Sequence, residues 1–343
     1  RQFELISLRE LVNEDKLQNI TPVLEPVKES FNNLNLAHKI FQEKDFYAYF
    51  IVNPFKGEKL GDTEFFLTYL SELENRRFLP AFHYSDNAEY IISSIEKYNL
   101  DNCLIVCLDN FSDEESLKSL YSNEKVSKIM LLEPHKYRSL DRSLKSIDKF
   151  YIRLDDVFEK QQKNADFLNI PAHKFSEEHL YYNQDGYQAF ADFTTLPSEF
   201  VEGGSTPRAV VIHLTYLNAD LENQIWIRHF TSTDVDSIAN VQGKFAQAAL
   251  KAVDFCDNLP LLNSDIFLLC SSEIFLPLKA SPIFFLASSG IVQPSAIISL
   301  RRLLSFSEVS LVLFLPIFLA RVFSTTSLGT LRPNKVFLIF SLV

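Results

Sequence analysis

Residues 102–109, NCLIVCLD, form a short apolar run that ends at Asp109. Runs of the same kind recur along the chain: ITPVLEP (20–26), YAYFIVNP (47–54), RFLPAFH (77–83), KIMLLEP (128–134) and KFYIRLDD (149–156). Strands with continuous apolar sequence are covered on both faces, as in parallel sheets. Each run therefore predicts one strand of a parallel sheet.

Charged segments with a helical period separate these runs. They are DTEFFLTYLSELENR (62–76), NAEYIISSIEKYN (87–99) and SDEESLKSLYSNEKV (112–126). Asp62, Asn87 and Ser112 are suited to cap their first turns. Alternating strands and helices indicate repeated βα units, because parallel strands need a crossover connection.

Two parallel architectures compete for this pattern. A seventh apolar run, YQAFADF (187–193), follows later, and the chain opens with RQFELISLRELV, as though it started inside a helix. One further strand upstream would give the eight of a (β/α)8 barrel. A doubly wound sheet would be favoured by a Gly-rich turn, but none of the 8 glycines stands in a GxGxxG pattern. We expect a TIM-barrel-like α/β fold whose first strand is missing.

A β-hairpin and a helix are expected after the seventh run. RAVVIHLTYL (208–217) and QIWIRHFTS (224–232) form the predicted hairpin, and residues 234–258 form the predicted helix, starting near Asp234. His213 and His229 lie in apolar strands and are expected to make hydrogen bonds in the core or at an edge. Arg228 is expected on the solvated side of the hairpin, with an anion contact as the alternative. The barrel domain, with hairpin 208–232, would span residues 1–258.

Residues 261–343 differ in composition from the rest of the chain. The segment 280–300 is uncharged and 309–320 is strongly apolar, which suggests a membrane anchor. However, the first contains Pro, Gly and Gln, and the second is shorter than the roughly 20 residues that a span needs. A native subdomain is disfavoured because no regular period persists. We interpret 261–343 as a non-native or disordered tail.

Charge and cysteine content exclude several classes of protein. The net charge of −11 gives no signal for direct nucleic-acid binding, which needs clustered Lys and Arg. Cys103, Cys107, Cys256 and Cys270 form no CxxC pair and indicate reduced thiols of a cytoplasmic protein. GxSxG, HExxH and P-loop patterns are absent from the sequence.

A polar residue follows each predicted strand at its carboxyl end. These residues are Glu25, Asn53, His83, Asp109, Glu133, Asp155 and Asp192. Carboxyl ends of barrel strands converge on one face, where active sites form. Turn and cap chemistry alone would also place such residues at strand ends. The convergence predicts an acidic mouth that could bind Mg²⁺ or Mn²⁺.

Each of these residues has a predicted role. Glu25, Asp109, Glu133 and Asp155 are candidate acid, base or metal-binding groups, with Asp109 and Glu133 as the metal ligands. His83 is a candidate proton shuttle, and Asn53 and Asp192 are candidate substrate contacts.

The segment SEEHLYYNQDGYQAFADF (176–193) precedes and includes the last predicted strand. Ser176 can cap a short helix, and Gly186 can end it before the strand carries Asp192 to the mouth. His179 and Tyr182 are expected as substrate contacts at its rim.

Several segments together carry a family resemblance. They include RQFELISLRE, ITPVLEPVK, FSEEHLYYNQDGYQAFADF, FVEGGSTPRAVVIHLTY and GKFAQAALK. Over residues 1–258 the chain resembles bacterial proteins of the "beta family", named after a phage protein and often encoded near mobile or defence genes. The resemblance implies a further strand before residue 1 and a charged segment after residue 258, which supports the interpretation of the tail. It brings no established reaction.

Two functions are consistent with these features. The first is a recognition module of a mobile-element or phage-defence gene pair, in which residues 176–204 and the hairpin contact a protein partner, because Tyr is enriched at interfaces. The second is a barrel hydrolase acting on a phosphodiester or nucleotide at the acidic mouth. The sequence favours the recognition module because it contains no compact catalytic motif.

Overall fold

The computed structural model describes residues 2–17, 19–109, 111–195, 198, 206–258 and 336–342. The chain divides into two compact units. The barrel unit comprises residues 1–157, 178–194 and 327–343, and the sheet unit comprises residues 158–177 and 195–326. The expected tail falls mostly on residues 259–335, outside the described residues. Among the helices that are described, none is long and apolar enough to cross a membrane.

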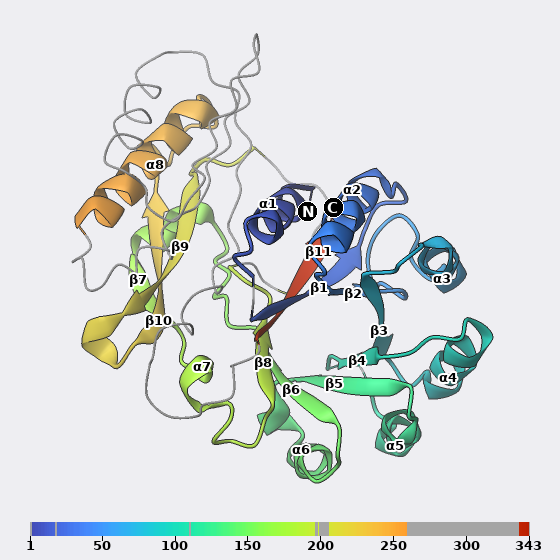
Figure 1. Ribbon diagram of the computed structural model, residues 1–343. Helices are drawn as coiled ribbons and strands as arrows, with labels where there is room; N and C mark the ends of the chain where they lie inside the picture. Colours follow the sequence, from blue (N-terminus) through green and yellow to red (C-terminus); the bar gives the residue numbers. More distant parts are fainter. Residues whose placement is uncertain are drawn as a thin grey trace. The chain divides into compact units, whose positions relative to one another are not determined.

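The barrel unit is an α/β structure built on a parallel sheet that curls as in TIM-like folds (Figure 1). Its strands are β1 (Ile20–Pro26), β2 (Ala48–Ile51), β3 (Phe78–Tyr84), β4 (Cys103–Cys107), β5 (Val126–Leu132), β6 (Phe150–Asp155) and β8 (Ala189–Asp192). Five of the seven fall within the predicted runs, while β3 ends one residue later and β5 begins two residues earlier than predicted. The strands pair in parallel, as their apolar sequences predict.

Helices separate these strands along the chain. They are α1 (Gln2–Asn13), α2 (Asn32–Glu43), α3 (Thr63–Glu72), α4 (Ala88–Lys97), α5 (Glu114–Ser122), α6 (Arg138–Lys145) after the 3-10 turn η1 (Pro134–Lys136), and α7 (Glu178–Tyr181). The Asp62 carboxylate caps α3 as predicted, since it accepts a hydrogen bond from Phe65 N. The cap of α5 is Asp113 rather than the predicted Ser112, because the Asp113 carboxylate accepts from Ser116 N.

The strand expected upstream of residue 1 has a counterpart at the other end of the chain. Strand β11 (Val336–Leu342) pairs in parallel with both β1 and β8. The strand order thereby closes as β1-β11-β8-β6-β5-β4-β3-β2. Residues 336–342 therefore belong to the barrel sheet, although the sequence assigns them to the tail.

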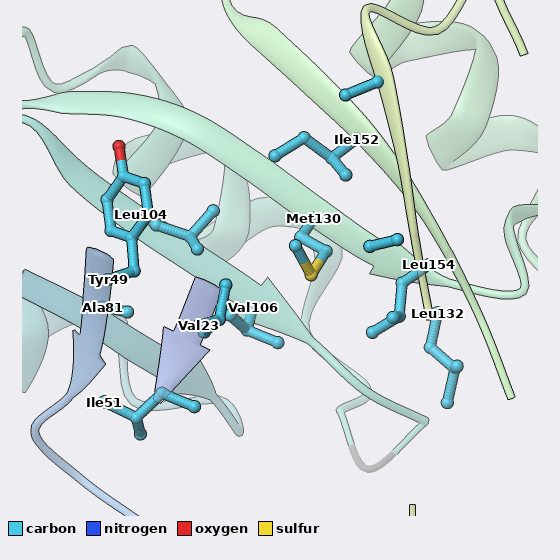
Figure 2. Close-up of a cluster of buried hydrophobic side chains, with 12 residues drawn as sticks. Val23, Tyr49, Ile51, Ala81, Leu104, Val106, Met130, Leu132, Ile152 and Leu154 are labelled. Atoms are coloured by element: carbon cyan, nitrogen blue, oxygen red, sulfur yellow. The ribbon is translucent and has the colours of Figure 1, made fainter. Parts of the chain in front are cut away.

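Side chains that alternate along the strands fill the interior of the barrel. This inner core includes Val23, Tyr49, Ile51, Ala81, Leu104, Val106, Met130, Leu132, Ile152, Leu154, Ala189 and Ala191, one or two from each of the seven strands (Figure 2). Residues between these positions point to the opposite face of the sheet, because side chains of a strand alternate. A strand-end residue an even number of positions from an inner-core residue therefore lies on the inner face of the sheet, and one an odd number of positions away lies on the outer face.

The sheet unit contains a three-stranded antiparallel sheet in the order β7-β10-β9. The predicted hairpin is confirmed as β9 (Val211–Asn218) and β10 (Gln224–Thr231), joined through the 3-10 turn η3 (Ala219–Leu221). Strand β7 (Ala172–Ser176), which follows the 3-10 turn η2 (Asn164–Leu168), was not predicted. The hairpin thus belongs to a different unit from the barrel strands, whereas the sequence places both in one domain.

Helix α8 (Val241–Asn258) packs on the hairpin through Phe245, Ala248 and Ala249. It begins later than the predicted start near Asp234. The Asp234 carboxylate accepts hydrogen bonds from Asp236 N and Ser237 N, which holds residues 234–237 in a turn. The Asn240 side chain then accepts from Gly243 N and caps the helix.

Candidate functional site

Glu25 and His83 form a buried pair at the carboxyl ends of β1 and β3, which we call the inner pair. His83 Nε2 lies 3.1 Å from Glu25 Oε1. Glu25 follows Val23 and His83 follows Ala81 by two residues, so both side chains lie on the face of the inner core. The exposed fraction is 7% for Glu25 and 2% for His83. The structure therefore brings together two residues that the sequence nominates from strands far apart in the chain.

The imidazole of His83 has one unsatisfied nitrogen. Its Nδ1 is buried and has no hydrogen-bond partner among the described residues. An ionised carboxylate can only accept a hydrogen bond, so Glu25 favours the His83 tautomer that carries hydrogen on Nε2. Nδ1 then carries a free lone pair.

Several contacts hold Glu25 in its ionised form. Burial by itself raises the pKa of Glu25, but hydrogen bonds from His83 and Phe55 N and the charges of His83 and Lys56 lower it by more. The net result is a lowered pKa of Glu25. The pair is thus a carboxylate hydrogen-bonded to a histidine, an arrangement suited to proton transfer.

The loop after β2 lies over this pair. The Phe55 ring stacks on the His83 ring with centroids 4.2 Å apart. Gly57 has a φ of +110°, and a Cβ there would lie 2.5 Å from Val27 Cα, so only glycine allows the loop to approach the chain after β1 this closely. Glu58 N also donates to Val27 O at 3.0 Å. Gly57 thereby positions Phe55 and Lys56 beside Glu25.

Asn53 joins the ends of β2 and β3. Its side-chain nitrogen donates to His83 O at 2.7 Å, and its side-chain oxygen accepts from His83 N at 2.8 Å. Both ends of the amide are therefore engaged in positioning His83. The role of Asn53 as a substrate contact stays a prediction, and its observed role is to hold the strand that carries the histidine.

Asp155 and Asp192 form a second buried group, which we call the outer pair. They are directly paired in register on β6 and β8. Each follows an inner-core residue, Leu154 or Ala191, by one position, so both lie on the opposite face from the inner pair. Both pairs lie at the carboxyl ends of barrel strands, but they lie on opposite faces of the sheet, and the roles predicted for Asp155 and Asp192 stay predictions.

The outer pair is electrostatically perturbed. Burial and the charges of Asp155 and Asp156 raise the pKa of Asp192 to about 6, against a hydrogen bond from Thr194 N at 2.8 Å. Burial also raises the pKa of Asp155, although Arg153 opposes this.

Arg153 is enclosed by carboxylates of the barrel unit. Its Nε lies 2.7 Å from Asp155 and its Nη1 lies 2.8 Å from Glu178. A further carboxylate, Asp185, lies 3.8 Å from Nη1. Arg153 is therefore engaged by Asp155 of the outer pair and by the carboxylates of Glu178 and Asp185.

The predicted metal ligands, Asp109 and Glu133, are not part of a larger cluster of ligands among the described residues. Asp109 is exposed, and Glu133 pairs with Lys136. Among the described residues, no group of three or more His, Cys, Asp or Glu side chains could hold a metal ion. Binding of Mg²⁺ or Mn²⁺ through Asp109 and Glu133 stays a prediction without support from the geometry.

The two predicted rim residues are buried. Each has an exposed fraction of 5%, and the Tyr182 ring lies 5.4 Å from the Phe190 ring. His179 and Tyr182 thus pack inside the barrel unit and offer little surface to a ligand.

Phe55 is the site residue that sequence reasoning missed. The signal lay in NPFKG (53–57), where a glycine follows closely after a strand end.

Comparison with known proteins gives no further guide to this site: no family model, curated protein or solved structure matches the chain.

Proposed function

We propose that the barrel unit is a (β/α)8-type hydrolase in which the inner pair activates water for attack on a phosphodiester or related ester. One observation carries the proposal: a buried carboxylate holds the His83 imidazole at Nε2 and leaves Nδ1 unsatisfied at the carboxyl ends of the strands. In barrels this is the end where catalytic residues gather. A structural histidine would be expected to use both nitrogens.

The reaction needs only a proton acceptor that can return the proton. His83 Nδ1 takes a proton from water as the water oxygen bonds to the phosphorus or carbonyl carbon. The bond to the leaving oxygen breaks, and that oxygen receives the proton from Nδ1. Glu25 stabilises the imidazolium that exists between these two steps. Proton transfer of this kind contributes rate factors of about 10² to 10⁴.

The charge beside the inner pair agrees with an anionic ester. Lys56 acts on Glu25 electrostatically and would meet the negative charge of a phosphodiester. Arg153 is engaged with carboxylates on the opposite face of the sheet. We therefore assign the substrate contact to Lys56.

Access to Nδ1 requires the Phe55 ring to move, because it stacks on the imidazole. The Phe55 side chain lies on the connection between β2 and α3, which Gly57 anchors to Val27. In this proposal the ring leaves His83 when the substrate binds and afterwards excludes bulk water.

A recognition module with a protein partner remains the alternative, together with the beta-family resemblance that suggests it. Large exposed apolar side chains occur in both units, such as Leu36 and Leu60 in the barrel unit and Ile238 in the sheet unit. Their distribution favours no particular contact surface, so the hydrolase is the better-supported proposal.

Ester hydrolysis tests the proposal. The full chain is assayed with bis(4-nitrophenyl) phosphate and 4-nitrophenyl acetate in the presence of EDTA. His83→Gln should lower kcat/KM at least about 100-fold, the lower end of the range for a lost general base. Glu25→Gln should lower kcat and displace the pH profile, which a purely structural role would not do.

His38→Gln is the matched control. His38 is also buried in the barrel unit, but its Nε2 accepts a hydrogen bond from Arg77 N just before β3, away from the carboxyl ends. Its substitution should affect thermal stability as much as His83→Gln and leave kcat/KM unchanged. The absence of hydrolysis by the unaltered chain, or equal activity of His83→Gln and His38→Gln, would exclude the proposed role.

A further inference from the structure

A groove of about 340 Å³ lies in the barrel unit, between α6 and the strand β6. Arg153 of β6 stands between two inner-core positions, so its side chain reaches the groove from the outer face of the sheet. The volume falls within the range of about 300 to 1,000 Å³ that is usual for small-molecule sites. Besides Asp141 and Tyr187, the lining residues are all basic: His135, Arg138, Arg142, Lys145 and Arg153.

Helix α6 differs in charge from the other helices. Its sequence, RSLDRSLK, contains three Arg or Lys residues and one acidic residue, and all four line the groove. Each of the other α-helices that the structure describes has at least as many Asp and Glu residues as Arg and Lys residues. In a chain of net charge −11, positive charge is thus concentrated on the helix that forms this groove.

Two of the cations are already paired and form a fixed part of the wall. Lys145 Nζ lies 2.8 Å from an Asp141 oxygen and 4.0 Å from the centre of the Tyr187 ring. Asp141 also accepts hydrogen bonds of 3.0 Å from the hydroxyl groups of Tyr151 and Tyr187. Arg153 is held by the three carboxylates described above. The charge of Asp141, the acidic lining residue, is therefore met within the wall itself.

The two arginines of α6 are not paired in this way. Among the residues that the structure describes, neither Arg138 nor Arg142 forms an ion pair or donates a hydrogen bond. Both side chains are exposed, so a ligand can reach them. Four residues of an α-helix rise about 6 Å, so the two arginines stand one turn apart along the groove.

This arrangement fits an anion with more than one charged group. A guanidinium group binds the oxygens of a phosphate or carboxylate through two parallel hydrogen bonds. A ligand with a single carboxylate would meet only one of the two arginines. Two linked phosphate groups can meet both, and they are small enough for a groove of this volume.

We propose that the groove binds a diphosphate group. Arg138 and Arg142 each hold one phosphate, while Lys145 and Arg153 add positive charge from the wall. The inference is independent of the proposed hydrolase, because neither Glu25 nor His83 lines the groove.

Calorimetric titration of the full chain with inorganic diphosphate tests this inference. The titration is made without divalent metal ions and at about 0.15 M KCl, which screens diffuse attraction between charges. Diphosphate should bind at least about tenfold more tightly than sulfate, which can meet only one arginine. ADP carries the same group on a nucleoside: tighter binding of ADP than of diphosphate would identify a nucleoside-linked ligand, and the reverse a free diphosphate.

Substitution of the two arginines separates a built site from general attraction. The double variant Arg138→Ala/Arg142→Ala should weaken diphosphate binding at least about tenfold. Because both side chains are exposed and unpaired, its melting temperature should match that of the unaltered chain. Arg142→Lys keeps the charge but loses the two-pronged hydrogen bonding, and should weaken binding at least about threefold. Lys39→Ala removes an exposed cation from α2 of the same unit and should leave binding unchanged.

Three results would each overturn the inference. They are no binding of diphosphate at millimolar concentration, equal affinities for diphosphate and sulfate, and a diphosphate affinity that the double variant lowers no more than Lys39→Ala does.

Discussion

Asp192 shows how a single buried carboxyl group can make stability depend on pH. Its pKa is raised to about 6, chiefly by burial and also by the charges of Asp155 and Asp156. The folded state therefore keeps the proton to a higher pH than the unfolded chain, in which an aspartate has a pKa of about 3.9. Between these values the folded state binds more protons, so the free energy of unfolding falls as the pH rises.

Asp192→Asn should remove this pH dependence. Asparagine keeps an oxygen that can accept the hydrogen bond from Thr194 N. The variant should exceed the unaltered chain in free energy of unfolding by up to about 3 kcal/mol at pH 7.5, and by much less at pH 4. Urea denaturation at both pH values measures the difference. Asp148→Asn, at an exposed aspartate of the same unit, is the control. A stability difference that does not change with pH would show that Asp192 titrates normally.

Strand parity explains which part of the site could be predicted from residues alone. The sequence identifies Glu25 and His83 because each is a polar residue next to an apolar strand run. The same criterion selects Asp155 and Asp192, although they point to the opposite face. Counting alternate positions back from the inner core would have separated the two groups, but the sequence does not show which apolar positions face inward when both faces are buried.

Among the secondary-structure elements, the sheet formed by β7, β10 and β9 carries a coupled pair of histidines. His213 and His229 lie directly opposite each other on β9 and β10. Burial, together with the neighbouring histidines, lowers the pKa of His213 to about 3 and that of His229 to about 4. Both imidazoles therefore stay neutral in the folded state at pH values where the unfolded chain gains protons.

The sheet unit should lose stability in mild acid. As the pH falls below the ordinary histidine pKa of about 6.5, the unfolded chain takes up protons that the folded pair does not. Between pH 6.5 and 5 the loss should be on the order of 2 kcal/mol, measured by urea denaturation with Trp226 fluorescence. His213→Gln should reduce this slope, while His135→Gln, at an exposed histidine of the barrel unit, should not. An equal slope in His213→Gln would contradict the assignment.

Elements with strong apolar runs were predictable, whereas others depended on distant partners. The seven barrel strands follow from their sequences because burial on both faces requires apolar residues. Strand β7, AHKFS, is short and largely polar, and it forms by pairing with β10. Helix α8 begins later than predicted because the Asp234 carboxylate accepts hydrogen bonds from nearby backbone N–H groups and holds them in a turn. Such side-chain hydrogen bonds compete with helix formation, and helical periodicity does not reveal them.

For the whole molecule, β11 determines whether the barrel sheet is closed. It pairs with β1 on one side and β8 on the other. These pairings join residues 336–342 to strands near the start and the middle of the chain, so local sequence patterns could not predict them. Without β11, both neighbouring strands would present unpaired edges, which readily pair with other chains.

A chain that ends at residue 335 should therefore aggregate. Light scattering and size-exclusion chromatography should show larger species than the full chain forms under the same conditions. Replacement of residues 336–342 by a Gly/Ser sequence of equal length is the matching control for chain length, and it should aggregate as well. If the shortened chain stays as monodisperse and as stable as the full chain, β11 is not part of the barrel sheet.

The central claim is that Glu25 holds His83 with its proton on Nε2 and its Nδ1 lone pair free. Nitrogen NMR of the full chain labelled with ¹⁵N-histidine, with His83 assigned by His83→Gln, measures this directly at pH 8. We expect hydrogen on Nε2 of His83 and a loss of this tautomer preference in Glu25→Gln. A proton on Nδ1, or protons on both nitrogens, would contradict it.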